Sequence, residues 1–557
     1  MSLSRSDALA ILTAPGEPYA LTDTLINGRS YRTFANAPAN LHDLFATAVD
    51  DSTFLVYAGE RLSFRETYAK AAAFACYLQA QGIASGDRVA ISLRNYPEWV
   101  IAFMAATSIG AIAVAMNALW QSDEMLYGLN DCGARVLIAD EERLERLAPI
   151  RNQVQIAVVA VRPTRPHTDT VEFNAALSPY LGQSMPTVAV APETSATIFY
   201  TSGSTGHPKG VLSTHRNVIS ALLSWELDAQ AAALIAGLTP QPGPYQPATL
   251  MAVPLFHVTG SHAVFLSCYR QHRKLVCMYR WNPETAAELI ESERITSVVA
   301  PAAMTGDLVR VARETQRDLS SLQVVGGGGA PRAPEQVRQI GATFASALPN
   351  TGWGMTETNA IGAGIGGLDY LAHPASSGRC SAVLELKVVD AEGNRLPAGE
   401  RGELLVRGTS VFQGYWNRPE LNATLFDDGW FRTGDVAYLD DEGYLYIVDR
   451  IKDLIIRGGE NIGCGQVEAA LVMHPDIIEA AVYAVPDERL GEEVGATVYA
   501  QAPIDEAALR DFLGAHLARF AIPRYLRFSD TPLPRTASGK ILKRELRDDA
   551  VNALVNS

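Results

Sequence analysis

The stretch TIFYTSGSTGHPKG at residues 197–210 decides the fold class, because it joins a short apolar run to a loop of glycine, serine and threonine. The apolar run is typical of a strand, and the loop after it offers backbone N–H groups and hydroxyls that can converge on an anion. Lys209 adds a mobile positive charge suited to phosphate. The spacing does not fit G-x-x-x-x-G-K-[ST], so a P-loop nucleotide hydrolase is not predicted. The stretch therefore predicts a phosphate-binding loop that follows a strand.

Strand-like and helix-like segments alternate on both sides of this loop. RVAISL at 88–93 precedes a helical segment around Trp99, and TAAELIESERI at 285–295 has helical spacing and leads into the strand SVVAP at 297–301. This alternation predicts largely parallel sheets covered by helices.

The pattern changes after about residue 380, where alternating strands separated by EG and GE turns predict hairpins. A smaller α+β stretch follows Arg450. We therefore predict an α/β protein with two domains. The large N-terminal domain, residues 1–450, has stacked helix-covered sheets plus a β-rich subdomain, and a small mobile α+β domain covers residues 451–557.

The composition excludes several classes of protein. The 557 residues carry 46 Lys and Arg against 61 Asp and Glu, a net charge of −15, whereas a protein that binds duplex nucleic acid needs a basic face. Hydrophobic residues make up 48% of the chain, enough for several cores. The six cysteines show no CxxC pair and no histidine at zinc-ligand spacing, which indicates reduced thiols in a cytoplasmic protein.

One uncharged stretch, residues 99–122, is long enough to cross a bilayer. It is rich in alanine, contains Asn117, and is divided by Gly110 into a helix-like half and a strand-like half. The N-terminus makes a poor signal peptide. We therefore predict a buried helix–turn–strand and no transmembrane segment.

Several further motifs occur along the chain: LSFRETY at 62–68, GGGGAP at 326–331, NTGWGMTET at 350–358, GWFRTGD at 429–435, DRIKDLIIRGGENI at 449–462 and PRTASGKILKRELR at 534–547. With TSGSTGHPKG, their order and spacing resemble the adenylate-forming (AMP-binding) superfamily of acyl-CoA synthetases, or fatty-acid–CoA ligases, peptide-synthetase adenylation domains and luciferases. The resemblance covers about residue 40 to the C-terminus. It implies that a carboxylate attacks the α-phosphate of ATP to give an acyl-adenylate, and that a thiol then displaces AMP after the small domain rotates.

The resemblance also implies a nucleotide site assembled from these motifs. Trp353 would flank the adenine, while Asp435 and Arg450 would contact the ribose. Glu357 and Thr205 would hold Mg²⁺, a hard cation that prefers oxygen ligands. The full set of expected nucleotide-binding residues is Thr201, Ser202, Gly203, Ser204, Thr205, Gly206, Lys209, Gly328, Gly329, Ala330, Gly352, Trp353, Gly354, Met355, Thr356, Asp435, Arg450 and Lys540.

By the same resemblance, Lys540, Lys209 and Glu357 are the expected catalytic residues. Lys540 would bridge the attacking carboxylate and the α-phosphate, offsetting charge where two anions must meet. The carboxylate is already ionised near neutral pH, so no general base is needed, and positioning and electrostatics carry the rate. For the thiol step, Lys452 matches the family's hinge position, and Gly458 and Gly459 would let the pantetheine arm of CoA pass.

His257, Met304 and Gly329 are expected at the acyl site. Amino-acid-activating relatives typically place an aspartate just after the aromatic residue at this position, where it pairs the α-amino group. This chain has His257 followed by Val258, and burying an ammonium without a partner is costly. We therefore expect a fatty or other hydrophobic acid without an α-amino group, although His257 could equally be a hydrogen-bonded core residue.

Three functional hypotheses follow. The leading one is an ATP-, Mg²⁺- and CoA-dependent acyl-CoA synthetase. The alternatives are an adenylating enzyme that loads an acyl-carrier protein, and a non-catalytic nucleotide- or lipid-binding relative. The expected partners are a small-molecule carboxylic acid, ATP and CoA, with no nucleic acid, and the chain is compatible with a homodimer.

Lys540→Ala is expected to slow acyl-adenylate formation by ~10² or more, by analogy with the loss of one transition-state donor. Supplied with ready-made acyl-adenylate, the same variant should still form the thioester. Pyrophosphate exchange and thioester formation measure the two steps separately. An equal loss of both steps would contradict alternation of the small domain.

Overall fold

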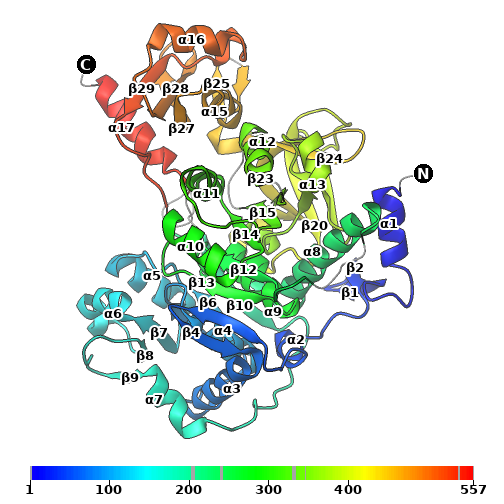
Figure 1. The fold of residues 1–557 in the computed structure, drawn as a ribbon, viewed down its shortest axis with the longest axis vertical. Helices are drawn as coiled ribbons and strands as arrows, with labels where there is room; N and C mark the ends of the chain where they lie inside the picture. Colours follow the sequence, from blue (N-terminus) through cyan, green and yellow to red (C-terminus); the bar gives the residue numbers. More distant parts are fainter. Residues whose placement is uncertain are drawn as a thin grey trace.

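The computed structural model describes residues 3–201, 207–238, 243–328, 334–344, 346–458, 460–536 and 540–555. A small body at the C-terminal end of the chain sits on one end of a larger body (Figure 1). β24 (Tyr444–Arg450) is the last strand of the larger body's sheet, and β25 (Ile455–Arg457) belongs to the sheet of the smaller body.

A first sheet contains β5 (Arg88–Ser92), β6 (Ile112–Ala115), β7 (Val136–Asp140), β8 (Ala157–Val161), β9 (Thr170–Glu172), β10 (Ser195–Thr201), β11 (Lys209–Thr214) and β21 (Gly414–Tyr415). Their order across the sheet is β21–β11–β10–β6–β5–β7–β8–β9. The strands from β10 to β9 run parallel, whereas β11 and β21 are antiparallel to their neighbours. The predicted phosphate loop connects β10 to β11 at one end of this sheet.

A second sheet contains β3 (Thr53–Tyr57), β4 (Glu60–Ser63), β12 (Ala248–Met251), β13 (Lys274–Cys277), β14 (Ser297–Ala300), β15 (Val324–Gly327), β16 (Leu348–Trp353), β17 (Ala363–Gly366), β18 (Gly378–Cys380), β19 (Leu384–Val389), β20 (Gly402–Gly408), β22 (Phe426–Asp427), β23 (Trp430–Leu439) and β24 (Tyr444–Arg450). Their order is β19–β20–β23–β24–β18–β17–β16–β15–β14–β12–β13–β3–β4, with β22 beside β23. The β-rich strands after residue 380 thus continue the parallel part of this sheet through β17, β18 and β24.

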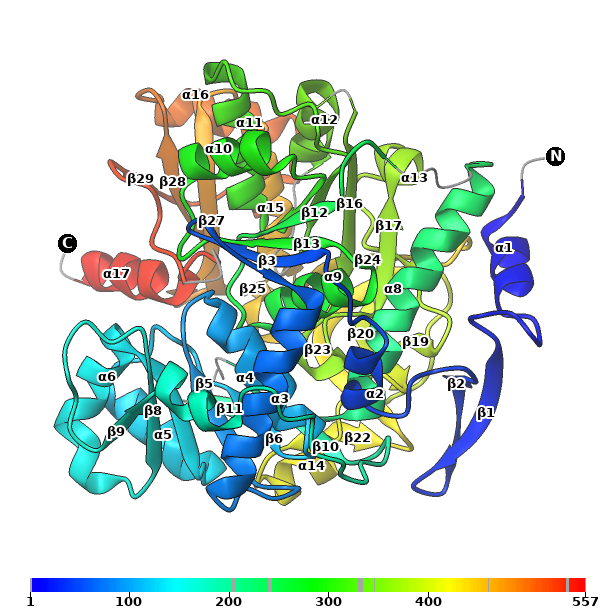
Figure 2. The same ribbon diagram turned by 60° about the horizontal axis from the view of Figure 1, so that its bottom comes forward.

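Helices cover and separate these sheets. The large body contains α2 (Leu41–Ala46), α3 (Phe64–Ala80), α4 (Pro97–Ser108), α5 (Ser122–Cys132), α6 (Glu141–Leu147), α7 (Phe173–Leu177), α8 (His215–Ile235), α9 (Ser267–Arg270), α10 (Pro283–Glu293), α11 (Ala302–Glu314), α12 (Pro334–Thr343), α13 (Gly367–Ala372), α14 (Pro419–Leu425) and the tighter or wider helical turns η1 (Ala148–Gln153), η2 (Ser178–Tyr180), η3 (Thr259–Leu266) and η4 (Thr356–Thr358). At the N-terminus, α1 (Arg5–Leu12) packs on α8, and β1 (Leu21–Ile26) pairs with β2 (Arg29–Phe34) in a peripheral hairpin (Figure 2).

The small body has its own sheet and core. Its elements are η5 (Ile451–Asp453), β25 (Ile455–Arg457), β26 (Glu460–Ile462), α15 (Cys464–Val472), β27 (Ile477–Asp487), β28 (Gly491–Ala500), α16 (Glu506–Gly514), η6 (Arg519–Ala521), β29 (Tyr525–Ser529) and α17 (Lys543–Val555). A separate cluster of buried aliphatic side chains fills it. The α/β fold class with a small α+β body at the C-terminus is confirmed.

The uncharged stretch 99–122 forms the predicted helix–turn–strand. It runs from α4 through Gly110, which has a left-handed φ of +73°, into β6. Trp99 and Phe103 of α4 are fully buried and pack edge-on against Phe265 of η3. α4 itself is apolar on all sides, which is typical of a helix buried inside a protein.

One other helix in the described part of the chain, α8, is long and apolar enough to cross a membrane, and half of its most apolar 18-residue window is buried.

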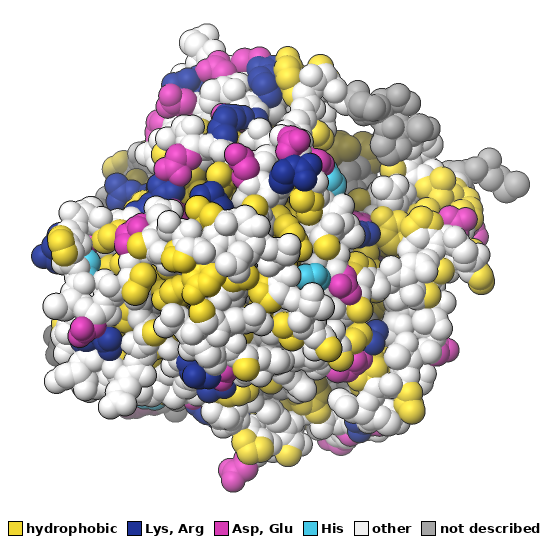
Figure 3. Space-filling model, turned by 90° about the horizontal axis from the view of Figure 1, so that it is seen from below, with side chains coloured by type: hydrophobic (Ala, Val, Ile, Leu, Met, Phe, Trp, Pro, Cys, Tyr) yellow, Lys and Arg dark blue, Asp and Glu magenta, His cyan; other side chains and the backbone are white. Residues whose placement is uncertain are grey.

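Two other predictions from composition can be compared with the structure. All six cysteines lie in the described part of the chain and are free thiols. On the face of the molecule in Figure 3, the coloured Lys and Arg side chains are interspersed with Asp and Glu.

A buried ion pair stabilises the first sheet where its strand β7 leads into α6. Arg143 of α6 pairs with Asp140 at the end of β7, and the two side chains are 1% and 3% exposed. Arg143 also donates to the carbonyl oxygen of Ala118 at 2.9 Å. Arg143→Ala would leave the Asp140 charge buried without its partner, at an expected cost of about 3–5 kcal/mol in the free energy of unfolding.

Urea unfolding of the wild type and the variant measures this loss. Arg310→Ala is the matched control, because Arg310 is half exposed and pairs with Glu314 one helical turn away. Its change should stay within about 0.5 kcal/mol. A loss for Arg143→Ala as small as that of the control would contradict the assignment of a buried structural pair.

Candidate active site

The carboxyl ends of neighbouring parallel strands bring the predicted acyl and nucleotide residues to one edge of the second sheet. β12, β14, β15 and β16 are adjacent, and they lead into His257, Met304, Gly328 and Trp353 respectively. Ligands of open α/β sheets bind at this edge.

Asp435 is the centre of a buried polar group next to that edge. Its side chain is 5% exposed, and each of its carboxylate oxygens has a partner. Trp353 Nε1 donates to Asp435 Oδ2 at 2.8 Å, and Arg450 Nε lies 3.0 Å from Asp435 Oδ1. The register of β23 and β24 places Arg450 directly opposite Asp435. Three residues from separate motifs are thereby brought into contact.

Glu357 is the centre of a second group. It is 6% exposed within η4, and Tyr415 donates its hydroxyl to Glu357 Oε1 at 2.6 Å. The ammonium of Lys209 lies 5.5 Å from the centre of the Tyr415 ring, in cation–π range. Pairing of β11 with β21 holds Lys209 and Tyr415 on adjacent strands.

The two groups also interact electrostatically. Burial raises the pKa of the Glu357 carboxyl, while the hydrogen bond from Tyr415 and the charge of Arg450 partly lower it and the charge of Asp435 raises it. Burial and the Glu357 carboxylate raise the pKa of Tyr415, so its hydroxyl keeps its proton and remains a donor. A desolvated carboxylate beside cationic side chains fits a site for a phosphate-bound divalent cation.

A strained turn presents Glu357. Asn359 and Ala360 follow it with left-handed φ values of 56° and 67°. The Asn359 amide donates to the carbonyl oxygen of Ser410 at 2.8 Å and accepts at 3.2 Å from His262, which is fully buried. Burial lowers the pKa of His262 to about 3, so the ring is neutral. Backbone strain of this kind persists where the surrounding contacts over-determine it, often at functional sites.

The part of this edge where the acyl site is predicted is apolar. Burial lowers the pKa of His257 to about 4, and its ring packs against Phe256 at 4.8 Å between centroids. Met304 is 6% exposed. The methyl group of Thr259 would lie 3.5 Å from a Cβ on Gly328, so the segment after His257 borders the end of β15.

Gly260 allows the chain to turn at this point. A Cβ there would lie 2.2 Å from the carbonyl oxygen of Pro254, which no side chain tolerates. The wide helical turn η3 begins beside it. Irregular turns of this type are frequent at functional sites.

The remaining predicted site residues fall into three sets. Thr201 ends β10, and Gly352, Gly354, Met355 and Thr356 lie along β16 and its turn into η4. Gly458 has a left-handed φ of 58° between β25 and β26, and Lys540 is exposed just before α17. Outside the described part of the chain lie Ser202, Gly203, Ser204, Thr205, Gly206, Gly329, Ala330, Gly459 and the side chain of Lys452.

Sequence reasoning missed Tyr415, His262 and Asn359. Tyr415 lies in GYW, for which the sequence gives no chemical signal, and its role depends on a partner 58 positions away. His262 and Asn359 likewise acquire their roles through a contact across 97 positions.

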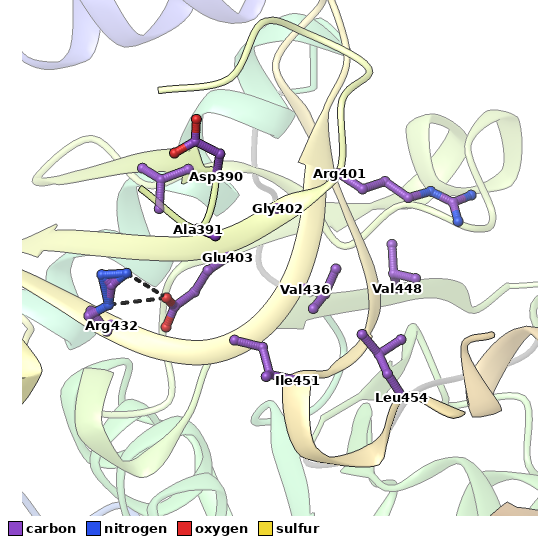
Figure 4. Close-up of a pocket in the computed structure, with 11 residues that line it drawn as sticks. Asp390, Ala391, Arg401, Gly402, Glu403, Arg432, Val436, Val448, Ile451 and Leu454 are labelled. Atoms are coloured by element: carbon purple, nitrogen blue, oxygen red, sulfur yellow. Dashed lines mark hydrogen bonds and ion pairs between the residues drawn. The ribbon is translucent and has the colours of Figure 1, made fainter. Parts of the chain in front are cut away.

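A cavity of about 490 Å³ lies where β23, β24 and β20 meet the segment after Arg450 (Figure 4). Val436, Val448, Ile451 and Leu454 form its apolar part, and the Glu403–Arg432 ion pair stands at one side. Ile451 and Leu454 flank the position of Lys452, so open space adjoins the predicted hinge.

Comparison with known proteins identifies the family. The AMP-binding enzyme family model matches residues 44–416, and the AMP-binding enzyme C-terminal domain model matches residues 466–540. A long-chain fatty acid–CoA ligase of Mycobacterium tuberculosis is 33% identical over 88% of this chain and 93% of its own length. A 2-succinylbenzoate–CoA ligase of Geobacillus kaustophilus is 36% identical over 87% of this chain and 92% of its own length.

Among solved structures, an anthranilate CoA ligase in complex with anthranoyl-AMP superimposes with a TM-score of 0.84 at 26% identity, covering 93% of this chain and 98% of that one. The o-succinylbenzoate CoA synthetase of Bacillus subtilis, in complex with its acyl-adenylate intermediate, gives a TM-score of 0.77 at 29% identity, over 92% and 98%. The chain therefore belongs to the AMP-binding enzyme family and is an AMP-forming acid–thiol ligase.

Proposed function

We propose that the chain is an ATP-dependent acyl-CoA synthetase that activates a fatty or other hydrophobic carboxylic acid. The observation that carries this proposal is a pair of side-chain groups, Trp353–Asp435–Arg450 and Lys209–Tyr415–Glu357, each built on a buried carboxylate, beside an apolar edge. The first group suits a nucleoside, the second suits phosphate, and the apolar edge suits the acyl chain.

In the first half-reaction, a carboxylate oxygen of the acid attacks the α-phosphorus of ATP. The bond between the α-phosphorus and the oxygen bridging to the β-phosphorus breaks, and pyrophosphate leaves with that electron pair. Asp435 accepts hydrogen bonds from the ribose hydroxyls, while Lys209 and Lys540 offset the charge of the phosphates. No side chain has to remove a proton, because the acid is already ionised.

In the second half-reaction, the sulfur of CoA attacks the acyl carbonyl carbon. The carbon–oxygen bond to AMP breaks, AMP leaves as an anion, and the thiol proton passes to solvent. This step uses neither the β- nor the γ-phosphate.

The residues present fit a Mg²⁺ ion shared with ATP. In the described ranges, no group of three or more His, Cys, Asp or Glu side chains could hold a metal. Mg²⁺ in nucleotide enzymes is held by one or two protein ligands together with substrate phosphates, and Glu357 would be such a ligand, with Thr205 as the second. When bound, the ion would neutralise phosphate charge as pyrophosphate departs.

The neutral, apolar acyl edge favours a hydrophobic acid. His257 carries no charge near neutral pH, its neighbours Phe256 and Val258 are buried, and Met304 at the end of the adjacent strand is buried too. An acid with an α-ammonium group would find no anion among these residues. The similar proteins named above include a long-chain fatty acid–CoA ligase, and a feruloyl-CoA synthase of an Amycolatopsis species is 34% identical over 89% of this chain, which supports a fatty or aryl acid.

Rotation of the small body would bring each half-reaction's residues to the site in turn. We place the boundary between residues 1–450 and 451–557, with the hinge at Lys452. The left-handed turn at Gly458 would present the loop that admits CoA. The cavity in Figure 4 supports this arrangement, because it gives Ile451 and Leu454 room to move as the backbone turns. We place the reaction in the cytoplasm.

Carboxylate-dependent exchange of labelled pyrophosphate into ATP tests the proposal, with a panel of fatty, aryl and steroid-like acids. We expect exchange with hydrophobic acids and none with α-amino acids. CoA and a phosphopantetheinylated carrier protein, offered in parallel, decide between the leading hypothesis and a carrier-loading enzyme. Absence of exchange with every acid would favour a non-catalytic nucleotide-binding protein.

Tyr415→Phe tests the contact that holds Glu357. The variant keeps the ring beside Lys209 but removes the donor to the buried carboxylate. A hydrogen bond to a charged group contributes about 1.5–3 kcal/mol, so the rate of pyrophosphate exchange should fall by roughly 10- to 100-fold. Tyr446→Phe is the matched control, because Tyr446 stacks on Tyr438 away from this contact. Equal rates for both variants would show that the Tyr415 hydroxyl is dispensable.

A further inference from the structure

Tyr127 of α5 contacts the outgoing arm of the predicted phosphate loop. Its hydroxyl donates to the carbonyl oxygen of Pro208 at 3.1 Å. Its ring stacks on that of His207, with centroids 4.3 Å apart and an angle of 13° between the planes. Pro208 immediately precedes Lys209, so these contacts determine where Lys209 enters β11.

The same helix contacts the incoming arm. Asp131 lies four residues after Tyr127, on the same face of α5. Tyr200, near the end of β10, donates its hydroxyl to Asp131 Oδ2 at 2.8 Å, and the same hydroxyl oxygen lies 3.3 Å from the carbonyl oxygen of Gly128. A Cβ on Gly128 would lie 2.5 Å from the Trp120 ring, so the glycine lets this ring pack directly against α5. One helical turn of α5 therefore holds the chain on both sides of the loop.

Arg418 joins these contacts to the Glu357 group. Its guanidinium donates to Asp131 Oδ1 at 2.7 Å and to the hydroxyl oxygen of Tyr127 at 2.9 Å. Arg418 follows Tyr415 by three residues, and Tyr415 is the donor to Glu357. The Tyr127 hydroxyl therefore donates to one arm of the loop while accepting from the segment that supports the proposed metal ligand.

This arrangement has an energetic consequence for a loop that contains glycine. Ordering such a loop around phosphate costs backbone entropy, about 1–2 kcal/mol per residue. A loop whose two arms are already fixed has less entropy to lose on binding, and the contacts at Pro208 hold Lys209 at the start of β11.

We propose that Tyr127 is a positioning residue that clamps the phosphate loop, together with Asp131 and Arg418, for the β- and γ-phosphates of ATP. The inference rests on the proposed function, in that the loop's ligand is taken to be ATP. The clamp should contribute only to formation of the acyl-adenylate, the step that uses ATP. Conversion of ready-made acyl-adenylate into thioester carries no β- or γ-phosphate and should not need the clamp.

Tyr127→Ala is the main test, in the full-length enzyme. The KM for ATP in pyrophosphate exchange should rise at least tenfold, with the KM for the acid unchanged. The rate of thioester formation from acyl-adenylate and CoA should stay within about twofold of the wild type. Tyr127→Phe keeps the ring on His207 and loses the hydroxyl, so its KM for ATP should lie between those of the wild type and of Tyr127→Ala. Tyr180→Ala, on η2 and in edge contact with Tyr77, is the control and should change neither step.

Equilibrium binding provides a readout that does not depend on catalysis. Measured by calorimetry, the Kd of Tyr127→Ala for ATP should rise at least tenfold, and its Kd for AMP should rise less than twofold. If the alanine variant does not fold, His207→Ala takes its place, because His207 is exposed and the change removes only the stacked ring. His207→Ala should weaken ATP binding as well, but by less than Tyr127→Ala.

An unchanged KM and affinity for ATP in Tyr127→Ala would overturn the clamp, as would equal losses in both half-reactions. These outcomes differ from failure of the proposed function. A wild type that binds ATP but exchanges no pyrophosphate would refute the synthetase, while the ATP and AMP affinities of the variants would still decide on the clamp. A wild type that binds no ATP would overturn both.

Discussion

The carboxylate of Asp435 is the constraint on which the rest of the site depends. It is buried, and a buried charge is tolerated only when its oxygens are satisfied. Trp353 satisfies one oxygen and Arg450 the other. Two strands, β17 and β18, separate the strands that carry these residues: Trp353 ends a strand of the parallel half of the second sheet, whereas Arg450 ends the last strand before the small body. A single carboxylate thus fixes the proposed nucleotide edge and the start of the proposed hinge relative to each other.

A few contacts likewise connect Glu357 to several parts of the predicted site. Tyr415 donates to this carboxylate, its ring faces Lys209, and the residues after it reach α5. The proposed metal ligand Glu357, Lys209 and both arms of the predicted phosphate loop are therefore connected through one short segment, β21 and the turn that follows it. The net charge of −15 makes such local devices necessary, because the overall charge of the protein repels ATP, pyrophosphate and CoA.

Much of this could be predicted from the sequence, and the rest could not for identifiable reasons. The alternation of strands and helices gave the α/β class, and Gly110 correctly divided an apolar run into α4 and β6 because a left-handed glycine ends a helix locally. That the β-rich strands extend the same sheet through β17, β18 and β24 was not evident, since pairing between distant strands has no local signature. Trp353, Asp435 and Arg450 contact one another in the structure, whereas the roles expected of them and of Glu357 remain predictions. Tyr415, His262 and Tyr127 were missed because each is defined by a partner far along the chain. The roles of Lys540 and Lys452 remain predictions.

The central claim is that the acid attacks the α-phosphate of ATP, and isotope transfer tests it most directly. An acid substrate with both carboxylate oxygens labelled with ¹⁸O is incubated with ATP, Mg²⁺ and CoA, and the products are analysed by mass spectrometry. Attack on the α-phosphorus, followed by cleavage at the acyl carbon, leaves a single ¹⁸O in AMP and the other in the thioester. Unlabelled AMP, or label in inorganic phosphate with ADP as the nucleotide product, would contradict the account.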